Sequence, residues 1–346
     1  MANPLMLLIG CDCDPDRPRY GGSRYDVRHS AQKWRGISEG IERLIQALDR
    51  VERAFDLKPK IVFCVRSDSQ MQEMHGTAGW MLTEYGTLWR ALEGRGHEIA
   101  WHPHLWRWSD KWGCWFQENE DSDWISESLT NGFTEFGRTW GKNPFTCHMG
   151  WTFHNDTSMQ TVAKLGVRLD FSASPGVFFK GGPGAAGTRF DNRIDWRGTP
   201  QQWYHPSTHD YRRPNRNDEP QLDLVEIPKF TSKSGLLKTA KHFSLLRKGK
   251  SLEPAQAVFL QITALPLLYG QVIRERLHTD EAEPFFATYF HPDELLEKKD
   301  VSAARFLYSA KHLEENIASI IRKTRMRGRE IKFVIGPEAL HSIGKG

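Results

Sequence analysis

The stretch Gly96-His97-Glu98-Ile99-Ala100-Trp101-His102-Pro103-His104-Leu105-Trp106 contains a short apolar run that ends in two histidines separated by a proline. In an extended segment the side chains at positions i and i+2 leave the backbone on the same side, so the imidazoles of His102 and His104 can converge on one ion. Pro103 restricts His102 to extended conformations. A His-x-His pair also occurs in proteins that bind no metal there, so further ligands elsewhere in the chain are needed to predict a metal site.

Apolar runs of strand length alternate with amphipathic segments of helix length along most of the chain. Besides the run that ends in His-x-His, we expect strands at 5–10, 60–65, 145–149, 167–172, 224–227, 285–290 and 331–335. We expect helices at 38–56, 80–94, 122–140, 157–165, 252–277 and 301–323, and a loop at 109–121. The alternation predicts βα units, a mainly parallel sheet and, with seven or so strands, a barrel.

The composition is that of an average globular protein, with 346 residues, 39% apolar and 26% charged. The 47 basic side chains exceed the 43 acidic ones by too little to indicate nucleic-acid binding. No uninterrupted apolar stretch of about 18 residues is present, so we expect no membrane-spanning helix. The opening MANPLMLLIGCDCD lacks the basic segment and cleavage site of an export signal, and five irregularly spaced cysteines fit a reducing compartment. We therefore expect a cytoplasmic protein.

Two segments lack periodicity or carry a run of charge. Residues 174–221 are rich in Gly, Pro, Asp and Arg, and a loop of this length is usually functional or partly disordered, so we expect it to cover a site. The basic segment 238–250 is typical of a solvated helix face, and contact with anionic lipid or a phosphorylated substrate is the alternative.

Chemically active residues recur where the apolar runs end. They are Asp12 and Asp14 after the first run, His148 in the run at 145–149, Asp170 in the run at 167–172, and His291 after the run at 285–290. The carboxyl ends of parallel barrel strands meet at one mouth, so we expect these residues to lie near His102 and His104. Burying an acid such as Asp12 without a partner costs free energy, which favours function over a simple turn. Cys11 and Cys13, which flank it, fit small-residue packing better than a metal pair, because the chain has no second Cys pair.

Aromatic residues are unusually frequent, with 13 tryptophans in the chain. Part of them must form the core, but tryptophans beside charged and glycine residues are hard to bury completely. Flat aromatic faces on loops hold sugar rings and other amphipathic ligands. The side chains that we expect to contact a substrate are Trp106, Trp151, Trp196 and Tyr204.

Taken together, the motifs resemble those of the polysaccharide deacetylase (NodB-homology) superfamily. The segment 96–104 is similar to its Gly-His-Glu-Ile-Gly-x-His signature, in the His-x-His form of a subgroup. Asp12-Cys13-Asp14 resembles its paired aspartates with one residue inserted, and 147–151 and 165–176 resemble its middle motifs. Tyr289-Phe290-His291-Pro292-Asp293-Glu294 resembles its final histidine motif, so the resemblance extends over about residues 5 to 335.

This resemblance implies one domain over residues 1–346, an α/β fold of the distorted (β/α)7 barrel type, with the loop 174–221 as an insertion. It implies that Asp14, His102 and His104 bind a divalent metal, preferably zinc, while iron, cobalt or manganese also fit. By the same resemblance Asp12 is the general base, His291 the general acid, and Asp170 holds and tunes His291.

His148 is where the sequence departs from the superfamily, which usually has an arginine that pairs with the base aspartate. An arginine is permanently charged, whereas a histidine can be neutral at pH 7. We therefore expect His148 to orient Asp12 in a different way or to join the metal shell.

The implied activity is hydrolysis of the amide of an N-acylated amino sugar or a sugar-containing intermediate by a metal-dependent deacetylase. Two alternatives stay open: hydrolysis of a non-sugar amide, cyclic amides included, and sugar binding by a catalytically inactive protein on the same scaffold. The acid–base pair Asp12 and His291 argues against the inactive protein, because a binder needs no such pair.

Overall fold

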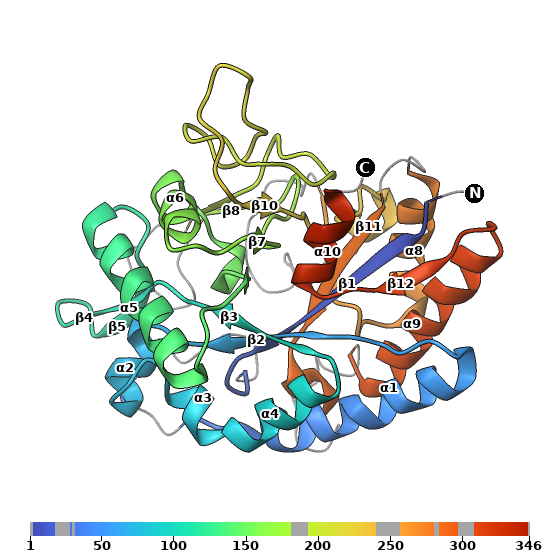
Figure 1. Cartoon of the computed structure of the whole chain (residues 1–346), viewed down its shortest axis with the longest axis horizontal. Helices are drawn as coiled ribbons and strands as arrows, with labels where there is room; N and C mark the ends of the chain where they lie inside the picture. The colour runs from blue at the N-terminus through green and yellow to red at the C-terminus, as the bar shows by residue number, and fades with distance from the viewer. Residues whose placement is uncertain are drawn as a thin grey trace.

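Parallel strands form the centre of the molecule and helices surround them (Figure 1). The computed structural model describes residues 3–17, 28–29, 32–180, 193–239, 257–279, 284–296 and 308–344. In spatial order the main sheet contains β10 (Val225–Glu226), β7 (Leu169–Asp170), β6 (Thr146–Cys147), β3 (Glu98–His102), β2 (Val62–Arg66), β1 (Leu5–Cys13) and β11 (Phe285–Phe290). A further strand, β12 (Ile331–Phe333), pairs with the start of β1.

The sheet curls because its two ends approach each other. β1 pairs with β11 along one side and, along the other, with β12 at its start and β2 at its end. At the far end of the sheet, Lys229 follows β10 and forms an isolated parallel bridge with Ala287 of β11. The N–H of Phe230 donates to the Ala287 carbonyl over 3.0 Å. The predicted distorted α/β barrel of mainly parallel strands is therefore confirmed.

Helices cover the outside of the strands (Figure 1). They are α1 (Ile41–Phe55), α2 (Ser69–His75), α3 (Trp80–Glu84), α4 (Gly86–Gly94), α5 (Ser122–Trp140), α6 (Asp156–Lys164), α8 (Pro266–His278), α9 (Ala310–Arg325) and α10 (Gly336–Ile343). α10 closes the end where the strands begin, since the Gly336 N–H donates to Glu98 at the start of β3 over 2.7 Å. No described helix is both long enough and apolar enough to cross a membrane.

Strand periodicity divides the core into two layers. Alternate residues of β1 and β2, such as Leu7, Ile9 and Phe63, pack outward among the helices. Residues of the opposite parity pack inside the barrel, among them Leu8, Val62, Cys64, Ala100, Leu169, Val225, Phe285 and Ala287. The inward parity continues into the residues that follow each strand, and it determines which polar side chains meet.

Helix boundaries follow from capping and from side-chain patterns. In α1 the buried positions Leu44, Leu48 and Val51 repeat at helical spacing. α5 begins after Asp121, whose carboxylate accepts the Trp124 N–H, and ends at Gly141 in the left-handed region, φ 85°. The expected helix at 122–140 is confirmed.

The prediction of a loop at 109–121 is wrong for residues 109–117. An antiparallel hairpin of β4 (Trp106–Ser109) and β5 (Cys114–Gln117) occupies it, and Trp108 faces Trp115 across the pair. Aromatic cross-strand pairs stabilise such hairpins. In the sequence, the polar turn between the two strands interrupts the alternation that would have indicated them.

Two expected helices have different limits. Of the segment expected as a helix at 252–277, residues 257–265 are not helical and α8 begins at Pro266, because proline fits only the first turn of a helix. Residues 252–256 lie outside the described residues. Residues 80–94 form two helices that meet at Tyr85. The helix expected at 301–323 begins as α9 after Ser309, whose hydroxyl accepts the His312 N–H over 3.1 Å; residues 301–307 lie outside the described residues.

The long segment 174–221 contains a short hairpin of β8 (Phe178–Lys180) and β9 (Arg193–Asp195). Residues 181–192 of this segment, and most of the basic segment 238–250, lie outside the described residues. The expected role of the basic segment therefore stays a prediction.

Candidate active site

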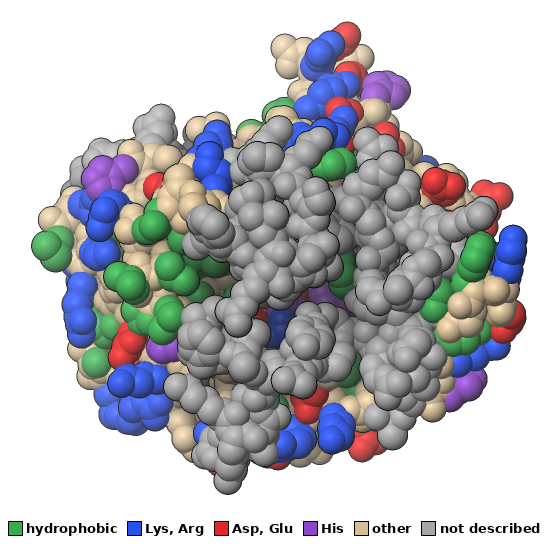
Figure 2. Space-filling view, turned by 180° about the vertical axis from the view of Figure 1, so that it is seen from behind, with side chains coloured by type: hydrophobic (Ala, Val, Ile, Leu, Met, Phe, Trp, Pro, Cys, Tyr) green, Lys and Arg blue, Asp and Glu red, His purple; other side chains and the backbone are tan. Residues whose placement is uncertain are grey.

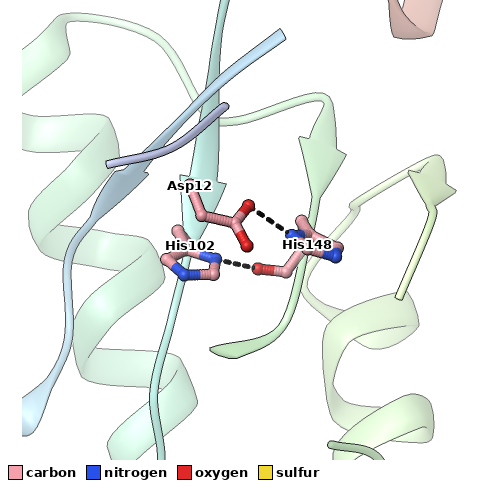
Figure 3. Close-up of side chains that lie close together, drawn as sticks. All are labelled: Asp12, His102 and His148. Atoms are coloured by element: carbon pink, nitrogen blue, oxygen red, sulfur yellow. Dashed lines mark hydrogen bonds and ion pairs between the residues drawn. The ribbon is translucent and has the colours of Figure 1, made fainter. Parts of the chain in front are cut away.

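Residues of inward parity bring the predicted site together at the carboxyl ends of the strands. They are Asp12 and Asp14 on and after β1, His102 and His104 on and after β3, His148 after β6, and His291 after β11. In β1 the inward positions are apolar until the strand reaches the site, in the order Leu8, Gly10, Asp12. Figure 3 shows Asp12, His102 and His148 converging from three segments. The face opposite to that of Figure 1 has a hollow in which acidic, basic and histidine side chains are visible (Figure 2).

The first half of the site, which we call the donor group, consists of Asp14, His102 and His104. His104 Nε2 lies 3.2 Å from Asp14 Oδ1 and 3.2 Å from His102 Nε2, and His102 Nε2 lies 3.7 Å from Asp14 Oδ2. One carboxylate and two imidazoles within 4.8 Å of one another match the ligands that zinc and related ions prefer. His102 Nδ1 donates to the His148 carbonyl over 2.5 Å, which leaves its Nε2 lone pair for an ion (Figure 3).

His104 is held in a different way. The Trp106 indole N–H donates to its Nδ1 over 2.7 Å, and an indole nitrogen can only donate. Neutral His104 therefore carries its proton on Nε2, facing Asp14, and must move it to bind an ion there. Burial, with a contribution from Arg66, lowers the pKa of His104 to about 4, so the ring is neutral at pH 7. The donor set thus fits a divalent ion once this proton has been displaced.

Gly150 makes room for the His104 ring. A Cβ at this position would lie 2.2 Å from ring atoms of His104, so only glycine permits the contact. The next two residues, Trp151 and Thr152, have φ values of 59° and 54°, in the left-handed region that non-glycine residues rarely occupy. The loop after β6 is therefore shaped closely around the donor group.

The second half of the site, which we call the base group, consists of Asp12, His148 and Lys229. His148 Nδ1 lies 2.6 Å from Asp12 Oδ1, and Lys229 Nζ lies 2.6 Å from His148 Nε2. Burial alone would raise the pKa of Asp12, but His148 and His102 outweigh it and hold that pKa well below its usual range. Burial lowers the pKa of His148 to about 4 and that of Lys229 to about 8. At pH 7 the group is an ionised carboxylate, a neutral imidazole and a largely protonated amine.

Asp12, His102 and His148 also form a second set of three potential ligands. Both ring nitrogens of His148 are engaged, however, one by Asp12 and the other by Lys229. Of the two expectations for His148, its orienting contact with Asp12 is therefore the one formed here.

His291 lies between the two groups. Its Nε2 is 3.9 Å from both Asp12 Oδ2 and Asp14 Oδ2, and its Nδ1 is 3.3 Å from Glu294 Oε1. Glu294 is buried and also binds Arg17 over 2.7 Å. Burial would raise the pKa of Glu294, but Arg17 and His291 lower it, so Glu294 is a carboxylate beside the imidazole.

Asp170 is not the partner of His291 in this structure. Leu169 and Phe171 point into the barrel, so Asp170 points outward, where its Oδ2 lies 3.5 Å from His154 Nε2. The expected contact with His291 is not formed, and Glu294 takes that place. Because side chains alternate along a strand, Asp170 points away from the barrel interior, and this alternation could have been read from the sequence.

Arg66 and Lys229 also belong to the site, although the sequence motifs did not predict them. Arg66 is fully buried at the end of β2; its Nη1 lies 3.1 Å from Asp14 Oδ1, and its Nε lies 2.5 Å from Asp68 Oδ2. Arg66 continues the inward positions Val62 and Cys64, and that position at a strand end is the signal that was available.

The four aromatic residues expected at the substrate differ in burial and in their contacts. Trp106 is buried against His104, and Trp151 is half-buried and packs edge-on against Trp106. Trp196 is buried and donates to the Thr152 carbonyl over 2.7 Å. Tyr204 is buried and donates to the Tyr211 carbonyl over 3.0 Å. Contact of these four with a substrate stays a prediction.

Solved structures similar to this chain include a candidate glycoside hydrolase/deacetylase from Parabacteroides distasonis, with 12% identity, a TM-score of 0.50, and 96% of this chain and 70% of that chain covered. Others are a candidate polysaccharide deacetylase from Mycobacterium smegmatis (14% identity, TM-score 0.46, 97% and 96% covered) and Puue allantoinase (11%, 0.45, 96% and 88%). No protein-family model and no curated protein matches the sequence. At these identities the likeness concerns the fold alone, and this chain shares the fold of the candidate glycoside hydrolase/deacetylase from Parabacteroides distasonis.

Proposed function

We propose that the protein is a metal-dependent hydrolase that removes an acyl group, in the simplest case acetyl, from the nitrogen of an amino sugar or a sugar-containing intermediate. The observation that carries this proposal is the convergence of the donor group, Asp12 and His291 at one end of the barrel. His291 Nε2 lies 3.9 Å from a carboxylate oxygen of both Asp12 and Asp14, so one small substrate group can reach all of them.

Asp12 acts as the general base. It is ionised at neutral pH, and the hydrogen bond from His148 occupies Oδ1, which leaves Oδ2 toward the site. From there it accepts the proton of the attacking water. A divalent ion on Asp14, His102 and His104, preferably zinc, would supply Lewis acidity for that water and for the amide carbonyl.

His291 acts as the general acid. The leaving amine needs a proton, and the Glu294 carboxylate, which lies 3.3 Å from Nδ1, orients the ring so that Nε2 faces the substrate. The side chains of His291 and Asp14 are 12% and 15% exposed, against 5% for Asp12. These two are therefore the groups that a substrate reaches first.

An amino-sugar substrate is supported by the aromatic residues around the site. Trp151 is half-buried beside the donor group, and the segment 174–221 reaches the same loop through Trp196. Apolar ring faces beside a few placed polar groups suit an amphipathic ligand.

The direct test measures acetate release from N-acetylglucosamine and its short oligomers, with one equivalent of zinc or with a chelator. The expected result is release that requires the metal and that is lost in Asp12→Asn. Saturable sugar binding without any release would instead support the inactive sugar-binding protein. Release from cyclic amides alone would support the non-sugar alternative.

A further inference from the structure

A lysine ammonium is buried directly behind the general base. Lys229 is completely buried, although an isolated buried charge is costly. Its Nζ lies 2.6 Å from His148 Nε2 and 4.9 Å from the centre of the Tyr289 ring. Within the described part of the chain, the His148 imidazole is the hydrogen-bond partner of Nζ.

The backbone fixes where this lysine points. The Lys229 N–H donates to the Ala173 carbonyl over 2.9 Å, and the residue forms the bridge to Ala287 that closes the barrel. Val225, Ile227 and Lys229 share the inward parity. The strand geometry therefore directs the ammonium into the barrel interior behind His148.

The hydrogen bonds in this group have only one consistent direction. An ammonium can only donate, so His148 Nε2 must accept. A neutral imidazole then carries its proton on Nδ1, and that N–H donates to Asp12 Oδ1 over 2.6 Å. The His148 ring stacks on the Phe171 ring, with a centroid distance of 4.4 Å and an interplanar angle of 9°, which restricts its rotation.

We propose that Lys229 is a positioning residue for the proposed reaction: its ammonium holds His148 Nε2 and so reinforces the Nδ1–H tautomer that the Asp12 carboxylate also requires, and this tautomer holds Asp12 with Oδ2 turned toward the site. The effect on catalysis rests on the proposed function, whereas the hydrogen bonds among Lys229, His148 and Asp12 do not depend on it. One arginine would supply both a charge and donors to Asp12. Here His148 supplies the donor and Lys229 supplies the charge.

Loss of the ammonium removes the partner of Nε2, so that the Asp12 carboxylate alone is left to fix the tautomer and the orientation of the ring. With the proton on Nε2, the Nδ1 lone pair would face the Asp12 carboxylate at 2.6 Å, which is repulsive, so Asp12 would turn away. Catalysis should suffer through the orientation of the base, with little effect on substrate binding.

The test is the tautomer of His148, measured by long-range proton–nitrogen NMR of the ¹⁵N-histidine-labelled full chain, with His148→Gln used to assign the signal. The wild type should show the Nδ1–H form, Lys229→Arg should keep it, and Lys229→Met should shift it toward Nε2–H. The exposed Lys142→Met is the matched control and should change nothing. An Nε2–H form in the wild type, or an unchanged tautomer in Lys229→Met, would overturn the inference.

Kinetics give a second readout. We expect kcat to fall about 10- to 100-fold in Lys229→Met with little change in KM, as for other residues that orient a catalytic group through a hydrogen bond. If the chain proves to have no hydrolase activity, the proposed function fails, while the NMR result still decides the role of Lys229.

A double variant covers the case in which Lys229→Met fails to fold. His148→Arg should be destabilised by two adjacent buried cations, and adding Lys229→Met should restore the free energy of unfolding, measured in urea. A double variant less stable than His148→Arg alone would contradict the division of roles between the two residues.

Discussion

The donor group and the base group lie side by side, yet they are held by different means. His102 of the donor group is oriented by a backbone carbonyl, and Gly150 shapes the loop around His104. In the base group, Asp12 is oriented by a chain of side chains, from Lys229 to His148. The donor group therefore depends on strand periodicity and backbone contacts, whereas the orientation of the base depends on contacts between side chains.

The largest expected effect separates the two groups. Asp12→Asn keeps the shape of the side chain but removes the base, so we expect turnover to fall about 10²- to 10⁴-fold. Metal content should stay at the wild-type level, because Asp12 lies outside the donor group. Acetate release and metal analysis of the same preparation check both statements, and joint loss of activity and metal would contradict the separation.

Gly150→Ala should act on the donor group. The added Cβ would lie 2.2 Å from the His104 ring, so the ring must shift, and we expect metal affinity to fall about 10- to 100-fold. Gly94→Ala is the matched control, since a Cβ there meets no atom within 4 Å. Zinc titration against a chromogenic chelator measures both variants. Equal affinities would show that His104 is not a ligand in this position.

Trp106→Phe should also act on the donor group, but should strengthen metal binding where Gly150→Ala weakens it. The indole N–H donates to His104 Nδ1 and so favours a proton on Nε2, the atom that must bind the ion. Removing this donor should tighten zinc binding, by about fivefold if the hydrogen bond contributes about 1 kcal/mol. Trp89→Phe, which removes an indole donor to the Met81 carbonyl, is the control. Weaker binding in Trp106→Phe alone would contradict this interpretation.

The smallest expected effect is the pH dependence of stability in the metal-free protein. Burial lowers the pKa of both His148 and His97 to about 4, against about 6.5 in an unfolded chain. Between these values the unfolded chain binds protons that the folded chain does not, so the free energy of unfolding should fall as the pH decreases. Urea unfolding at pH 7 and pH 5 measures the difference, which should shrink in His148→Asn and in His97→Asn. An unchanged difference in both variants would show that neither histidine is buried neutral.

Much of the donor group was accessible from the sequence because each of its residues lies at the end of an apolar run and its two histidines are close together in the chain. Asp14, His102 and His104 follow apolar runs directly, and the i, i+2 spacing places both histidines on one side of an extended segment. The parallel barrel also followed from the alternation of strand and helix patterns.

The base group was only half predictable. Asp12 and His148 sit at strand ends, but Lys229 follows a strand of two residues and lies 81 positions from His148. The misplaced role of Asp170 has a simpler reason, since its neighbours Leu169 and Phe171 already occupy the inward positions. The β4–β5 hairpin that positions Trp106 was hidden by its polar turn, because a turn and a loop have the same composition.

The most direct test of the central claim is the metal content of the protein purified without added metal, compared with the double variant His102→Ala/His104→Ala. A metal-dependent hydrolase with this donor group should carry about one divalent ion per chain, and the double variant should carry none. No ion in either protein, even after incubation with zinc, would contradict the metal-dependent mechanism.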